Sequence, residues 1–261
     1  IDKEKPNGVL IIPADNPTGY QMSQDEIIEI AKICVEKSIW LISDEAYRNI
    51  YFTNNGPTSI WNISNKVVPG IKGRRISIES VSKVWNACGL RIGALVTDNE
   101  VMFDKVRSEY TANLCANVIG QYIFGSIASL SSQEIVEWYK MQREYYSEII
   151  KDLISGLEQE LPGLIISQPK ASIYIILDFS DITPDDFNIA TFIEYAAKYG
   201  ISHYGKKKYT LLLSPMNGFF TTKIPGGKLA RLALVEPKDK LNIVPSILSS
   251  LLKDYLLKAK V

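Results

Sequence analysis

Residues 8–43, GVLIIPADNPTGYQMSQDEIIEIAKICVEKSIWLIS, decide the fold. This stretch begins with a nearly unbroken apolar run, residues 8–14, and ends with another, residues 39–43. Short apolar runs are typical of strands buried on both faces of a parallel sheet. Between them, Ser23-Gln24-Asp25-Glu26 has the Ser-x-x-Glu form of a capping box, and apolar residues follow it at helical spacing. The stretch therefore predicts a strand, a helix over residues 23–37 and a second strand.

The same strand pattern continues on the C-terminal side of this unit. We predict further strands at residues 75–79 and 92–97, so the rhythm favours βαβ units and an α/β fold with a mostly parallel sheet. After them the chain becomes helical, with predicted helices at residues 100–108, 118–129 and 131–161. The remainder is mixed, with predicted strands at residues 173–179, 209–213 and 229–235 and predicted helices at residues 187–199 and 238–258. We therefore expect a large domain over residues 1–143 and a smaller α+β domain over residues 144–261, bridged by the helix at residues 131–161.

Composition excludes several classes of function. The 261 residues are 46% hydrophobic and 22% charged, with a formal net charge of zero, so no nucleic-acid or membrane-surface partner is expected. No apolar run approaches the roughly 20 residues that span a bilayer, and no signal-peptide pattern opens the chain. The sequence does not begin with Met. We expect a fragment of a longer chain.

Cysteine and histidine content points to a reducing environment without a metal centre. Cys34, Cys88 and Cys115 are widely separated and lack metal-ligand spacing, which favours reduced, partly buried thiols in a cytoplasmic protein. The single histidine, His203, lies far from the other motifs and is read as structural. We therefore predict no metal site.

Polar motifs follow three of the predicted strands. Asn16-Pro17-Thr18-Gly19 follows the first, Asp44 ends the second, and Ser80-Val81-Ser82-Lys83 follows the third. Because open α/β sheets bind ligands outside the carboxyl ends of their strands, we expect these motifs to converge on one crevice. Together with Tyr47 and Arg91 they supply an amine, a carboxylate, a phenol, an amide, hydroxyls and a guanidinium. That set suits a phosphorylated pyridine aldehyde, pyridoxal 5′-phosphate (PLP), used as an electron sink.

Each candidate also has a simpler explanation. Lys83 is the candidate for the amine that bonds to the aldehyde carbon, or it is an exposed loop lysine. Asp44 is the candidate partner of the ring nitrogen, or it caps a helix. Tyr47 and Asn16 are candidate donors to the ring oxygen, or they are a core tyrosine and an ordinary Asx-Pro turn.

The remaining candidate site residues, Ser80, Ser82, Arg91 and Arg231, have side chains that suit the binding of an anion. Ser80 and Ser82 offer short hydroxyls to a phosphate, and Arg91, in a Gly-Leu-Arg-Ile-Gly frame, offers a two-pronged contact. Arg231 lies in the predicted strand at residues 229–235, where an arginine among apolar neighbours needs an anion. That anion is either a substrate carboxylate or a structural ion-pair partner. The coincidence of the whole set, rather than any one residue, favours PLP.

The order and spacing of these motifs resemble the class I/II aminotransferases, which are fold-type I PLP enzymes. The resemblance covers most of the chain and is strongest from residue 13 to residue 93. It implies that Lys83 forms the Schiff base, that Asp44 contacts the pyridine nitrogen, and that Tyr47 and Asn16 contact the ring oxygen. It also implies that Ser80, Ser82 and Arg91 bind the phosphate. Arg231, with Asn16, then binds the substrate.

The same resemblance implies a reaction and an oligomeric state, and it also shows where this sequence differs from the family. It implies transfer of an amino group from an L-amino acid to a 2-oxo acid by a homodimer. PLP-dependent C–S lyases and decarboxylases share these core residues, and a non-catalytic regulatory domain of this fold is a further alternative. Family members carry a segment before the Asn-Pro-x-Gly motif that this sequence does not contain. We therefore expect an incomplete sheet with an exposed edge or face, and little activity from these residues alone.

Overall fold

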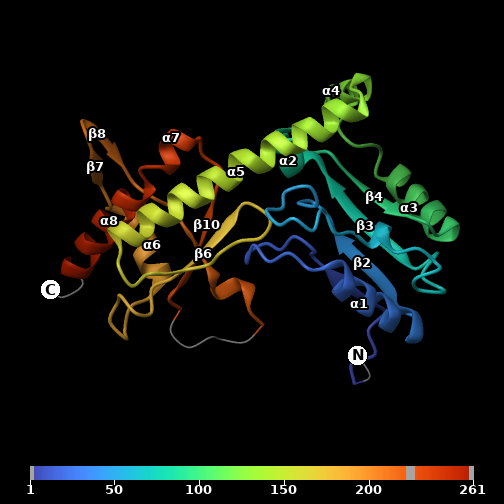
Figure 1. Ribbon diagram of the computed structural model, residues 1–261, viewed down its shortest axis with the longest axis horizontal. Helices are drawn as coiled ribbons and strands as arrows, with labels where there is room; N and C mark the ends of the chain where they lie inside the picture. Colours follow the sequence, from blue (N-terminus) through green and yellow to red (C-terminus); the bar gives the residue numbers. More distant parts are fainter. Residues whose placement is uncertain (1–2, 222–226, 259–261) are drawn as a thin grey trace. The chain divides into compact units, whose positions relative to one another are not determined.

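The chain divides into two compact units, each described here by itself. The computed structural model describes residues 3–221 and 227–258. The first unit comprises Ile1–Asn16, Tyr20–Arg143 and Lys170–Ser172, and the second comprises Pro17–Gly19, Glu144–Pro169 and Ile173–Val261. Figure 1 labels most of their α-helices and strands. The predicted functions of the two halves, a PLP-binding domain over residues 1–143 and a small domain over residues 144–261, stay predictions.

The first unit contains a sheet with helices around it. Its strands are β1 (Gly8–Ile11), β2 (Trp40–Asp44), β3 (Arg75–Ser80) and β4 (Gly93–Thr97). Its α-helices are α1 (Gln24–Glu36), α2 (Val81–Val84), α3 (Glu100–Ala112), α4 (Val118–Gly125) and the first part of α5 (Ser132–Glu160). Its 3-10 helices are η1 (Ile60–Asn62), η2 (Cys88–Leu90) and η3 (Ser126–Ser129).

The predicted α/β sheet is present, with one strand reversed. The strand order is β1-β2-β3-β4, in which β1, β2 and β3 are parallel and β4 is antiparallel to β3. A crossover helix, α1, joins β1 to β2, and Ser23 caps it with the predicted reciprocal bonds to Glu26. The expected repeat of βαβ units stops there. Between β2 and β3 the chain forms irregular segments and η1, and between β3 and β4 it forms only α2 and η2.

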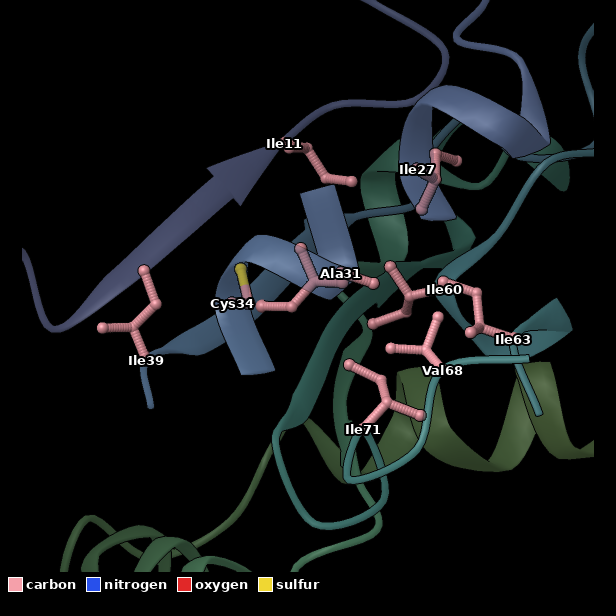
Figure 2. Packing of buried hydrophobic residues seen from close by; sticks show 10 residues of the cluster. Ile11, Ile27, Ala31, Cys34, Ile39, Ile60, Ile63, Val68 and Ile71 are labelled. Atoms are coloured by element: carbon pink, nitrogen blue, oxygen red, sulfur yellow. The ribbon is translucent and has the colours of Figure 1, made fainter. Parts of the chain in front are cut away.

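The core of the first unit lies between α1 and one face of this sheet. The cluster of buried residues is Ile11, Ile27, Ala31, Cys34, Ile39, Leu41, Ile60, Ile63, Val68 and Ile71. Figure 2 shows Ile27, Ala31 and Cys34 of α1 together with Ile60, Ile63, Val68 and Ile71 of this cluster. Apolar residues of the segment between β2 and β3 therefore complete the core beside α1, a role that a second crossover helix has in a regular βαβ fold.

The opposite face of the sheet is exposed. Leu10 of β1, Ile78 of β3 and Leu95 of β4 are 57%, 41% and 44% exposed, respectively. The prediction that the apolar runs mark strands buried on both faces is therefore wrong for β1, because α1 covers only the face that carries Ile11. We expected an exposed edge or face of the sheet, and this face is exposed in the first unit.

The second unit is built on an antiparallel sheet. Its strands are β5 (Ile165–Ile166), β6 (Tyr174–Asp178), β9 (Ser214–Pro215) and β10 (Leu229–Ala233), in the order β5-β6-β10-β9, with a separate hairpin of β7 (Ser202–Tyr204) and β8 (Lys207–Tyr209). Its helices are the second part of α5, α6 (Ile189–Lys198), η4 (Met216–Phe219), α7 (Lys238–Leu241) and α8 (Val244–Lys258). Phe179, Phe187, Phe192 of α6 and Tyr255 of α8 pack their rings together.

Two predicted elements of this unit differ from the structure. Residues 210–213 are not a strand, since β8 ends at Tyr209 and β9 begins at Ser214. The predicted helix at residues 238–258 is two helices, α7 and α8. Pro245 lies in the first turn of α8, where proline is tolerated because its missing N–H has no partner within the helix.

Candidate functional site

The carboxyl ends of β2 and β3 bring two of the predicted motifs side by side. In the parallel ladder Asp44 pairs with Ile78, and Ser80 follows two residues later on β3. Because successive side chains of a strand alternate between faces, Asp44, Ile78 and Ser80 lie on one face, opposite to α1. The sheet thus places the candidate carboxylate and the start of the Ser80–Lys83 motif at neighbouring strand ends.

Asp44 and Tyr47 lie in a short turn that follows β2. The Asp44 carboxylate accepts a hydrogen bond from the backbone N–H of Ala46 at 3.1 Å, and the N–H of Arg48 donates to the carbonyl of Glu45 at 3.0 Å. Tyr47 is buried. The turn is therefore closed by local hydrogen bonds, one of which involves the candidate ring-nitrogen partner itself.

Ser80 to Lys83 form the start of α2. Ser80 is its N-cap, and its hydroxyl accepts from the N–H of Ser82 at 3.1 Å. Gly93 of β4 faces Ser80, and a Cβ on Gly93 would lie 2.8 Å from the carbonyl oxygen of Glu79. The close approach of β4 to β3 at this point requires glycine.

Two side chains of α5 hold the turn that carries Lys83. Gln142 Nε2 donates to the Lys83 carbonyl at 3.2 Å, and Trp138 Nε1 donates to the Val84 carbonyl at 2.9 Å. The Trp138 ring stacks on Trp85 with centroids 5.9 Å apart. Neither Trp138 nor Gln142 is among the site residues predicted from the sequence.

Arg91 and Ser80 line different cavities. Arg91 has a left-handed backbone (φ 54°), and its Nη1 donates to the carbonyl of Cys88 at 2.9 Å. It lines a cavity of about 630 Å³ beside α3 and α4, whereas Ser80 lines one of about 190 Å³. The two cavities share Ile92, Gly93, Ala94 and Phe124. The predicted joint binding of a phosphate by Arg91 and the serines stays a prediction.

Asn16 begins the predicted turn. The N–H of Asp15 donates to the carbonyl of Tyr20 at 2.8 Å, which closes the loop that contains the motif. Gly19 has a φ of 69°, and a Cβ there would lie 2.5 Å from Pro169 Cβ, so both its conformation and its surroundings require glycine.

Arg231 belongs to the second unit. It lies on β10 between β6 and β9, on the less buried face of the strand. Its Nη2 donates to Ser214 Oγ at 3.1 Å, and its guanidinium lies 4.5 Å from the ring centre of Tyr174 and 5.2 Å from that of Phe219. Its role in binding a substrate carboxylate stays a prediction.

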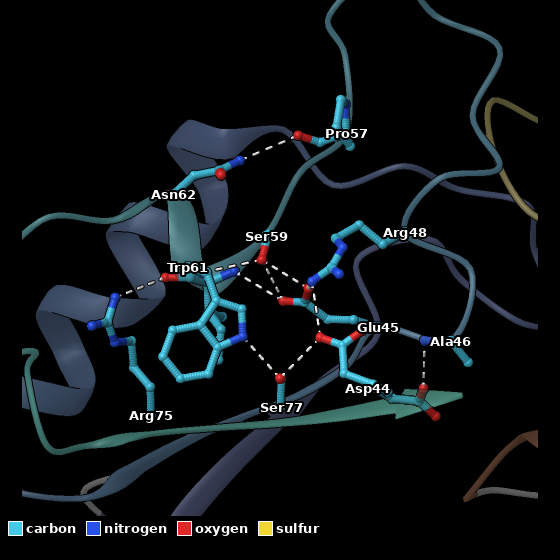
Figure 3. A network of polar contacts seen from close by, with 12 residues as sticks. Asp44, Glu45, Ala46, Arg48, Pro57, Ser59, Trp61, Asn62, Arg75 and Ser77 are labelled. Atoms are coloured by element: carbon cyan, nitrogen blue, oxygen red, sulfur yellow. Dashed lines mark hydrogen bonds and ion pairs between the residues drawn. The ribbon is translucent and has the colours of Figure 1, made fainter. Parts of the chain in front are cut away.

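A partly buried ionic network lies beside the first cavity and was not predicted from the sequence. Arg48 Nη1 donates to Glu45 Oε2 at 2.6 Å and to Glu79 Oε1 at 2.9 Å (Figure 3). Burial lowers the pKa of Arg48, but the carboxylates of Glu79 and Glu45 outweigh burial and raise that pKa overall. Burial likewise raises the pKa of Tyr139, which lines the same cavity, against the opposing effect of Arg48.

Other kinds of site find little support in the described residues. Within residues 3–221 and 227–258, no group of three or more His, Cys, Asp or Glu side chains could hold a metal ion. No helix in that part of the chain is long and apolar enough to cross a bilayer. The thiols are free; Cys34 is buried, whereas Cys88 and Cys115 are exposed, so the expectation of partly buried thiols is wrong for those two.

Comparison with known proteins identifies the family. The profile of the aminotransferase class I and II family matches residues 1–199. The chain belongs to that family. It is 26% identical over 267 residues to a Saccharomyces cerevisiae protein named "probable kynurenine–oxoglutarate transaminase", covering 97% of this chain and 56% of that protein. It is 25% identical over 177 residues to an Aquifex aeolicus protein named "probable aspartate/prephenate aminotransferase", covering 68% and 43%.

Solved structures show the same fold. The N-succinyldiaminopimelate aminotransferase of Mycobacterium tuberculosis aligns with a TM-score of 0.77 at 19% identity, covering 94% of this chain and 58% of that one. The aromatic aminotransferase of Pyrococcus horikoshii aligns with a TM-score of 0.75 at 21% identity, covering 95% and 60%. This aminotransferase-family chain therefore has the fold-type I architecture. It spans about half the length of the curated relatives it matches.

Proposed function

We propose that the protein transfers an amino group from an L-amino acid to a 2-oxo acid with PLP as its cofactor. Family membership supports this proposal, as do the relatives' names and a solved structure from Clostridium difficile that holds PLP (TM-score 0.78, 18% identity). The observation that carries it is the placement of Asp44 and the Ser80–Lys83 motif at the adjacent carboxyl ends of β2 and β3.

The chemistry of these side chains fits PLP. When bound, PLP supplies an electron sink for the substrate α-carbon. We propose that Lys83 would hold PLP through its Nζ, as a Schiff base formed with loss of water. Once the substrate amino group has displaced it, the freed Lys83 amine would carry the proton taken from the substrate α-carbon. Asp44, which ends a strand and faces away from α1, provides the carboxylate for the ring nitrogen. The hydroxyls of Ser80 and Ser82 donate to the phosphate.

The finer assignments are proposals of the same kind. Asn16 and Tyr47 donate to the ring oxygen, Arg91 adds a cation for the phosphate, and Arg231 binds the substrate carboxylate together with Asn16. We further propose a homodimer, tested by light scattering, and a cytoplasmic location, tested by fractionation. Because the relatives compared above are named as aminotransferases, we favour amino transfer over elimination, decarboxylation or a regulatory role.

Absorption spectroscopy tests the proposal on the longest natural chain that contains these residues. PLP should produce a visible band that Lys83→Ala abolishes and that Lys105→Ala, a change on α3, leaves intact. Particular amino acids should bleach the band with release of the matching 2-oxo acid. A wild-type protein without the band would refute PLP binding, and a band that survives in Lys83→Ala would refute the role of Lys83.

A further inference from the structure

Arg48 connects the two strand ends that carry the proposed site. Glu45 directly follows Asp44 at the end of β2, and Glu79 directly precedes Ser80 at the end of β3. One nitrogen of Arg48, Nη1, donates to both carboxylates, at 2.6 Å and 2.9 Å (Figure 3). The ladder between the strands ends with the hydrogen bond from the N–H of Glu45 to the carbonyl of Ile78 at 2.9 Å. Arg48 therefore bridges the strands just past the point where their backbones stop pairing.

Both carboxylates are anchored independently of Arg48. The Glu45 side chain is fully buried; it accepts from Ser59 Oγ at 2.7 Å and 2.8 Å and from the N–H of Ile60 at 3.1 Å. Glu79 Oε1 accepts from Ser77 Oγ at 3.1 Å, and Ser77 Oγ accepts from Trp61 Nε1 at 2.8 Å. The bridge therefore joins two fixed points rather than two mobile side chains.

Alternation of side chains makes this bridge a support for the opposite face. Glu79 and Ser77 point toward η1 and α1, and Glu45 points the same way, since it contacts Ser59. Their chain neighbours Ser80 and Asp44 therefore point to the other face. Because peptide bonds are planar and stiff, fixing Glu45 and Glu79 also fixes the backbone that carries Asp44 and Ser80.

We propose that Arg48 is a positioning residue that sets the separation between Asp44 and the Ser80–Lys83 motif. The inference rests on the proposed function, since it assigns these two groups to the same cofactor. Arg48 contacts neither group directly in the structure; it acts through Glu45 and Glu79.

The positive charge of Arg48 distinguishes this positioning role from a role in packing alone, because loss of the charge has a pH-dependent effect. The titratable groups that face Arg48 are Glu45, Glu79 and, from α5, Tyr139. Without the guanidinium, the buried Glu45 and the nearby Glu79 repel each other, and protonation of one of them relieves the repulsion. A defect in Arg48→Met should therefore shrink at lower pH and in the double variant Arg48→Met/Glu79→Gln. Simple loss of packing would respond to neither change.

Hydrogen exchange on the cofactor-free protein tests the bridge without relying on PLP. Arg48→Met should raise exchange by about tenfold or more in residues 44–50 and 79–86 together, and Arg48→Lys by less. Arg48→Met/Glu79→Gln should return both segments to within about threefold of the wild type. Arg107→Met, which removes an exposed arginine paired with Asp104 on α3, serves as the matched control and should change neither segment.

PLP affinity is the second readout. In Arg48→Met the dissociation constant should rise about tenfold near pH 8 and less near pH 6, with recovery in the double variant. Exchange and affinity both within about threefold of the wild type would overturn the inference, as would faster exchange in only one segment. If Arg48→Met does not fold, the comparison of Arg48→Lys with the double variant decides. A wild-type protein that binds no PLP refutes the proposed function, while the exchange data still decide whether Arg48 couples the two strand ends.

Discussion

Replacing Gln142 with methionine should cost little or no stability, although it removes a buried hydrogen bond. Gln142 is only 4% exposed, and its Nε2 donates to the Lys83 carbonyl at 3.2 Å; its 3.5 Å contact with Asn86 Oδ1 is too long to contribute much. Loss of one such neutral bond costs about 0.5–1.5 kcal/mol. The Lys83 carbonyl also accepts from the N–H of Asn86 at 3.2 Å, so it keeps a partner in the variant.

A second atom of Gln142 offsets this loss in the free energy of unfolding. Its Oε1 is buried and has no hydrogen-bond partner in the described part of the chain. A buried unsatisfied acceptor costs about 1–3 kcal/mol, and methionine removes it while filling a similar volume. The two contributions together predict a variant between about 0.5 kcal/mol less stable and about 2.5 kcal/mol more stable than the wild type.

Urea unfolding followed by circular dichroism and tryptophan fluorescence measures this difference. Gln133→Met, an exposed change on the same helix that loses a contact to Glu137, serves as the control and should lie within about 0.5 kcal/mol of the wild type. A loss of more than about 1 kcal/mol in Gln142→Met would refute the reasoning, because it would mean that Oε1 is satisfied and the Lys83 contact is worth more than a neutral hydrogen bond.

Three further predictions concern the first unit. Leu41→Ala should lower the free energy of unfolding by about 2–5 kcal/mol in urea titrations, because Leu41 is fully buried in the cluster beneath α1. Gly93→Ala should cost about 1–3 kcal/mol, because the added Cβ meets the Glu79 carbonyl, whereas Gly89→Ala, with open space around it, should cost less than that. Hydrogen bonds from Tyr20 and from Ser23 lower the pKa of Glu26, so its stabilising contribution is present above its unfolded pKa of about 4.3 and is lost as the pH falls through its lower folded pKa. The stability difference between wild type and Glu26→Gln should accordingly shrink as the pH is lowered from about 6 to about 2, and a constant difference would contradict this.

Local patterns predicted the elements that local forces determine. The capping box of Ser23 and Glu26 indicated where α1 begins, and the apolar runs located β1 to β4 to within a few residues. Neither pattern carries information on strand direction, so the reversal of β4 was not anticipated. The break between α7 and α8 was missed although Pro245 could have signalled it, because proline in a first turn starts a helix as readily as it interrupts one.

The sequence also did not indicate which face of the sheet is covered by other elements. An apolar run in a strand shows that its side chains can be buried, not which of its faces is covered in a given chain. Ile11 and Leu10 are both apolar neighbours on β1, yet only Ile11 belongs to the core. The segment that completes the core, with Ile60, Ile63, Val68 and Ile71, has no helical or strand periodicity over its length, and only tertiary structure reveals its role.

For the candidate site, residues that supply chemistry were easier to find than residues that hold them. Asp44 and Ser80 stand out because polar groups after apolar strands are conspicuous. Glu45, Arg48 and Glu79 are ordinary charged residues in the sequence, and only the register of β2 against β3 brings their charges together. Asp44-Glu45 and Glu79-Ser80 are pairs of chain neighbours, and in each pair the two side chains point to opposite faces of the sheet. The residues proposed to contact the cofactor, Asp44 and Ser80, are therefore each adjacent in the chain to a residue that fixes the backbone, Glu45 or Glu79. For the same reason, a substitution of Arg48, which lies on the covered face, is expected to change the positions of Asp44 and Ser80 on the opposite face.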